Sequence, residues 1–114
     1  MNLGILNNIE SLNDKSLQLR YSNTSQALLF ADEALKYSTE INNEKWLAIS
    51  KLNKFWCLFL KSDFNNIIDK LIKLIFYFSD SGLESYRAEA LLLTAQVQEG
   101  YGVYEILQNK IVAV

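Results

Sequence analysis

Apolar residues recur along this chain at intervals of three and four positions, which places them on one face of an α-helix. Turn-forming residues interrupt this spacing five times. Proline is absent and there are only four glycines, so little within the segments opposes helix formation. The pattern predicts an all-α chain of about six helices, which cover residues 5–21, 24–41, 44–61, 64–79, 83–99 and 103–114.

The segments between the predicted helices carry residues that cap helices or form turns. Asn23, followed three positions later by Gln26, matches a variant of the capping box, in which the Asn23 side chain accepts hydrogen bonds from free amides of the next helix. Residues 42–43 are both asparagine, which tolerates left-handed backbone. Asp63 is the expected N-cap of the fourth helix, and the glycines of residues 100–102 are expected to end the fifth.

The most apolar part of the chain is residues 43–80, which contains both tryptophans. The predicted helix 64–79 carries two apolar rows. The first row consists of Phe64, Ile67, Leu71, Leu74 and Phe78. The second row consists of Ile68, Ile72, Ile75 and Phe76. An apolar arc this wide predicts burial on two sides or an exposed face that takes a partner. In the fifth helix, the residues expected in the core are Ala88, Leu91, Leu92 and Ala95.

The segments repeat at a fixed interval of 40 residues. In the first helix of each pair, Leu12, Leu52 and Leu92 correspond. In the second helix the corresponding sets are Thr24, Phe64 and Tyr104, then Ala27, Ile67 and Leu107, then Ala31 with Leu71, and Ala34 with Leu74. A fixed period with two helices per repeat indicates a helical solenoid, in which stacked helix pairs share one core.

The run from Thr24 to Leu35 resembles the second helix of a tetratricopeptide repeat (TPR), and so do the segments that follow Asp63 and Gly102. The 40-residue spacing is similar to the longer variant found in bacterial regulatory proteins rather than to the form of about 34 residues. Two features depart from the family. Asn53 stands where a small residue is expected, and the proline that often ends a unit is missing.

The resemblance implies one TPR-like domain over residues 1–114, built from antiparallel helix pairs stacked in a right-handed superhelix. The expected units cover residues 2–42, 43–81 and 82–114. The last unit is shorter than the others and has no polar capping helix. We therefore expect the chain to be part of a longer protein, the alternative being that another subunit covers its open end.

Composition offers little support for catalysis. The chain has no histidine and one cysteine, which removes the commonest general base and the usual zinc ligands. Cys57 lies in an apolar run and is expected in the core. We expect no catalytic residue, metal or cofactor. The net charge of −2 gives no reason to expect nucleic acid. No signal peptide or membrane span is visible, so a cytoplasmic location is expected.

A TPR-like solenoid offers a groove lined by the first helix of each unit. Carried over from the family, the groove residues are Asn7, Glu10, Asp14, Gln18, Ser50, Lys54, Arg87, Thr94 and Gln98. Their amides and charges suit the backbone and acidic groups of an extended peptide. The family's clamp for a C-terminal carboxylate is not reproduced at these positions.

Three functions remain open at this stage. The first is a non-catalytic module that binds or senses a protein or peptide, within a bacterial signalling protein whose output domain is a diguanylate cyclase, a histidine kinase or a DNA-binding domain. The second is a self-associating scaffold, a homodimer formed through Ile68, Ile72, Ile75 and Phe76. The third is a small stand-alone chaperone for a secreted client.

Overall fold

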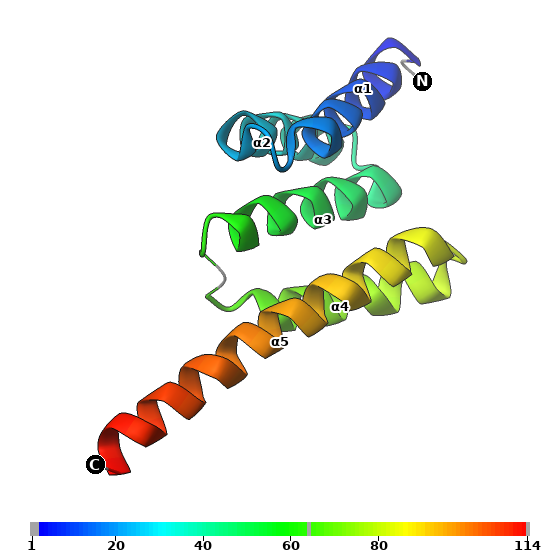
Figure 1. The fold of residues 1–114 in the computed structure, drawn as a ribbon. Helices are drawn as coiled ribbons and strands as arrows, with labels where there is room; N and C mark the ends of the chain where they lie inside the picture. Colours follow the sequence, from blue (N-terminus) through cyan, green and yellow to red (C-terminus); the bar gives the residue numbers. More distant parts are fainter. Residues whose placement is uncertain (1–2, 64, 114) are drawn as a thin grey trace. The chain divides into compact units, whose positions relative to one another are not determined.

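The structure is a computed structural model that describes the backbone of residues 3–63 and 65–113 and the side chains of residues 3–63 and 65–100. These residues form no strand and five helices (Figure 1): α1 (Leu3–Leu19), α2 (Thr24–Glu40), α3 (Glu44–Leu60), α4 (Ile67–Asp80) and α5 (Glu84–Ala113). The predicted all-α class is confirmed. The chain divides into two compact units, Met1–Phe64 with α1, α2 and α3, and Asn65–Val114 with α4 and α5.

The helix break expected at residues 100–102 is absent. Helix α5 continues to Ala113, so the described chain has five helices where about six were expected. A glycine inside a helix costs roughly 1 kcal/mol relative to alanine, which weakens the helix without ending it. The side chains expected on a sixth helix, those of Tyr104, Leu107 and Ile111, lie outside the described residues.

The connection between α3 and α4 also differs from the prediction. Asp63 does not cap α4; its amide instead donates to the carbonyl of Leu58 at 2.8 Å, which closes the end of α3. Ser62 next to it is left-handed, with φ of 62°. Helix α4 begins at Ile67, after a left-handed Asn66 whose side chain makes no capping hydrogen bond. Phe64, the expected first residue of this helix, lies outside the described residues.

The cap predicted at Asn23 is present, and Asn43 caps the helix that follows it. The Asn23 side chain accepts a hydrogen bond from the Gln26 amide at 3.2 Å, at the start of α2. The Asn43 side chain accepts from the Trp46 amide at 3.0 Å, at the start of α3. Each cap satisfies one of the amides that the first turn of a helix leaves free.

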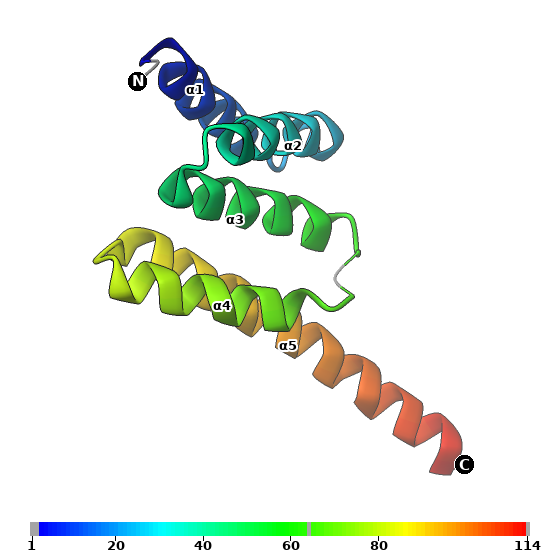
Figure 2. The same cartoon turned by 180° about the vertical axis from the view of Figure 1, so that it is seen from behind.

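The core of the first unit lies where its three helices meet (Figure 2). Helix α1 packs on α2, α2 packs on α3, and α1 also contacts α3. Ile9 and Leu12 of α1 are buried against Ala34 of α2. The buried positions of α2 are all small: Ala27, Ala31, Ala34 and Ser38. Small side chains allow neighbouring helix axes to approach closely.

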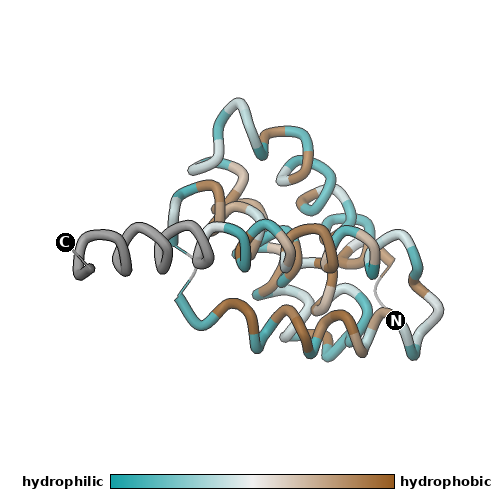
Figure 3. The backbone as a smooth tube through the Cα atoms, turned by 60° about the horizontal axis from the view of Figure 1, so that its bottom comes forward, coloured by the Kyte–Doolittle hydropathy of each residue, from teal (hydrophilic) through white to brown (hydrophobic). Residues whose placement is uncertain are grey.

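The second unit is a helical hairpin of α4 and α5. The buried residues of α4 are Ile67, Leu71, Leu74 and Phe78, all of which belong to the first predicted row. Among the described side chains of α5, those of Ala90, Leu93 and Val97 are buried. The prediction for α5 was wrong, because Ala88, Leu91, Leu92 and Ala95 are exposed. Figure 3 shows apolar stretches along both α4 and the coloured part of α5.

The 40-residue interval recurs in the backbone and in burial. The four buried residues of α2 and the four of α4 are separated by 40 positions in every case. The turns after these helices also match. The Asn43 amide donates to Ser38 at 3.1 Å, and the Leu83 amide donates to Phe78 at 2.9 Å. Residues 42 and 82, one position earlier, are both left-handed.

The left-handed position in the second of these turns is expected to require glycine. Gly82 has a φ of +70°, and a Cβ added there would meet nothing within 4 Å. Gly82→Ala should therefore lower the free energy of unfolding by about 1 kcal/mol through backbone strain alone. The reciprocal change Asn42→Gly, at a φ of 53°, should raise it. Urea denaturation followed by circular dichroism checks both, and a Gly82→Ala protein as stable as the parent would contradict the strain argument.

Candidate interaction surfaces

A buried polar layer joins α1 to α3 in the first unit. The side-chain amide nitrogen of Asn53 donates to the side-chain oxygen of Asn13 at 2.9 Å. The side-chain amide nitrogen of Asn13 donates in turn to Ser50 Oγ at 3.1 Å. Arg20 Nη2 donates to Asn53 Oδ1 at 3.0 Å. All four residues are buried, so these bonds form away from water and set how α1 lies along α3.

Arg20 brings a positive charge into this layer. The residue is 5% exposed, and its guanidinium carbon lies 4.8 Å from the centre of the Trp56 ring. The ring face attracts the cation, and the contact is stronger away from water. The indole nitrogen of Trp56 is buried and has no hydrogen-bond partner among the described residues. The guanidinium thus contacts both the side-chain oxygen of Asn53 and the ring of Trp56.

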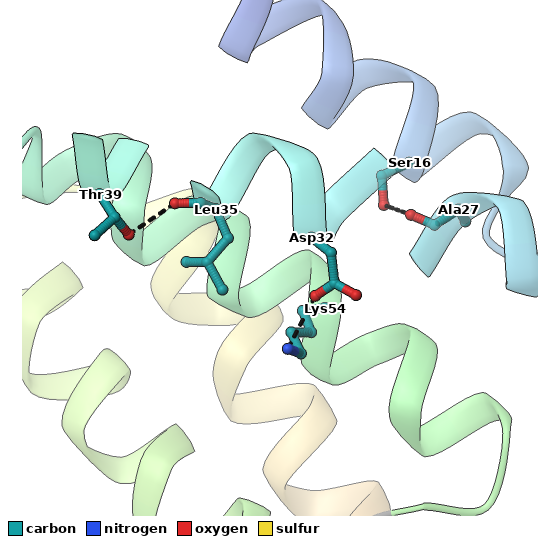
Figure 4. Close-up of polar contacts among 6 residues, drawn as sticks. All are labelled: Ser16, Ala27, Asp32, Leu35, Thr39 and Lys54. Atoms are coloured by element: carbon teal, nitrogen blue, oxygen red, sulfur yellow. Dashed lines mark hydrogen bonds and ion pairs between the residues drawn. The ribbon is translucent and has the colours of Figure 1, made fainter. Parts of the chain in front are cut away.

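Cys57 lies beside the polar layer and is fully buried. Burial raises the pKa of its thiol above the ordinary value of 9.0, and the opposing effects of Ser16 and Arg20 do not cancel this. The Ser16 hydroxyl also donates to the Ala27 carbonyl at 2.8 Å, which ties α1 to α2 (Figure 4). A buried thiol with a raised pKa is a core residue rather than a nucleophile.

Cys57 is therefore expected to resist alkylation in the native protein. Its folded pKa lies above its unfolded pKa, so its contribution to stability is complete below pH 9 and is lost as the pH rises beyond it. Labelling with iodoacetamide at pH 8 should follow global unfolding as urea is raised. Modification at the rate of a free thiol in the absence of urea would contradict this.

The expected groove residues of α1 share an exposed face. Asn7, Glu10, Asp14 and Gln18 are all exposed. Ser50 is not available to a ligand, because it is fully buried and accepts the hydrogen bond from Asn13. Lys54 pairs with Asp32 of α2 at 2.9 Å and is half-buried, so its charge is partly satisfied within the unit (Figure 4).

The remaining groove residues belong to α5. Arg87 pairs with Glu84 of the same helix at 3.4 Å. The Thr94 hydroxyl donates to the Ala90 carbonyl at 2.7 Å, and Gln98 is exposed. The four residues on α1 form one exposed polar face, and Arg87, Thr94 and Gln98 lie on one face of α5 by helical spacing.

The second apolar row of α4 is only partly covered. Phe76 is 65% exposed and Ile72 is 40% exposed. Ile68 and Ile75 are half-buried. The opposite charges of Asp69 and Lys73 are exposed on the same helix. We name Ile68, Ile72, Ile75 and Phe76 the α4 row. It is an apolar strip on a helix whose other apolar residues, Ile67, Leu71, Leu74 and Phe78, are already buried in the hairpin with α5.

Two features escaped the sequence reasoning. The polar layer was missed because Asn53 looked like a departure from the family, although Asn13 stands 40 positions earlier and marks a repeated asparagine. The inner face of α5 was missed because Ala90, Leu93 and Val97 follow helical spacing as well as the residues chosen. In the second case the sequence contains two apolar faces and no signal that ranks them.

Within the described residues, no helix is long and apolar enough to cross a membrane. The same residues contain no group of three or more side chains of histidine, cysteine, aspartate or glutamate placed to hold a metal ion. Comparison of the chain with models of protein families, with curated proteins and with solved structures found no match.

Proposed function

We propose that this protein is a non-catalytic module that binds another protein through the α4 row. The observation that carries the proposal is the exposure of Phe76 and Ile72 on a helix whose opposite side, from Ile67 to Phe78, is already buried in the core. Surface aromatic and aliphatic residues in a strip are typical of sites that accept the apolar face of a partner helix. The neighbouring charges Asp69 and Lys73 would form the polar rim.

The proposal extends to the architecture. The matched turns and the matched buried positions of α2 and α4 support a TPR-like repeat of 40 residues. In such a solenoid the polar face of α1, with Glu10 and Asp14, is a second surface for a peptide. On the family resemblance, the module acts in the cytoplasm within a bacterial signalling protein, where partner binding is passed to an output domain.

Photo-cross-linking tests the proposed surface. Benzoylphenylalanine in place of Phe76 should cross-link a defined partner in lysate from the source cells. The same group in place of Leu29, which is 61% exposed on α2, is the matched control and should not. An excess of unlabelled parent protein should suppress the cross-link, whereas the Ile72→Glu protein should suppress it far less because a charge disrupts an apolar contact.

The competitors also separate the two surfaces. If Ile72→Glu suppresses the cross-link as well as the parent does, the α4 row is not the binding site. If instead an unlabelled protein carrying both Glu10→Lys and Asp14→Lys fails to suppress the cross-link, the partner binds the polar face of α1.

A further inference from the structure

We draw no further inference here: the strongest candidate, the surface patch at the C-terminal end of α1 where Leu17 and Tyr21 are exposed, is an unpartnered helix face, and nothing in the structure shows what covers it.

Discussion

Replacing Phe78 by alanine is expected to lower the free energy of unfolding of the α4–α5 hairpin by about 3–5 kcal/mol. Phe78 is fully buried, and its ring lies 5.7 Å from that of Tyr86 on the facing helix. A hairpin of two helices has few other buried residues, so the loss of this ring removes a large share of its core. Hydrogen exchange read by mass spectrometry, peptide by peptide, would show α4 and the start of α5 losing protection.

The matched control stands two positions away. Phe76 is 65% exposed, so Phe76→Ala should change stability by no more than about 0.5 kcal/mol. Both variants remove a phenylalanine ring from α4, so a difference in stability between them comes from the burial of Phe78 and not from the loss of an aromatic side chain. Equal losses of protection in the two variants would show that Phe78 is not the core residue described here.

Replacing Asn53 by leucine is expected to destabilise the first unit by about 2–4 kcal/mol. Leucine keeps the branched shape of the side chain, although it is bulkier, but it can neither accept from Arg20 nor donate to Asn13. A buried guanidinium that loses an acceptor costs more than a neutral group in the same situation. Urea denaturation followed by circular dichroism measures the change, and Asn8→Leu on the exposed side of α1 is the control that should have little effect.

A double-mutant cycle isolates the pair. Asn13→Leu together with Asn53→Leu should destabilise less than the sum of the two single changes, by about 1 kcal/mol, because their mutual hydrogen bond is lost only once. Strict additivity would mean that the two asparagines contribute separately and that the polar layer does not act as a unit.

The helices and their caps could be predicted because they depend on neighbouring residues. The spacing of apolar positions defined α2 and α3 within one residue of their observed ends, and Asn23 marked the start of α2. Gly100 and Gly102 were misleading, since glycine permits a break but does not require one. The start of α4 was misplaced for a related reason, because Asp63 completes the end of α3 instead of opening the next helix.

The candidate surfaces depend on which helices meet, and local sequence does not contain that information. The α4 row was visible as a surplus of apolar residues over what one neighbour could cover. For α5, two apolar faces were present, and only the packing against α4 decides that Leu93 is inside and Leu92 outside. Ser50 was placed in the groove because its pairing with Asn13, 37 residues away, has no local signal.

The four small buried residues of α2 and their four bulky counterparts on α4 limit how the chain can be recombined. The turns that follow the two helices share their hydrogen bonds, so a chimera that exchanges α2 for α4 would keep the backbone junction at the C-terminal end of the exchanged helix. It would nevertheless place Ile67, Leu71, Leu74 and Phe78 where α1 and α3 leave room for alanine and serine. Overpacking of that size forces helices apart. Helices α2 and α4 therefore share the turn that follows them, yet neither can replace the other.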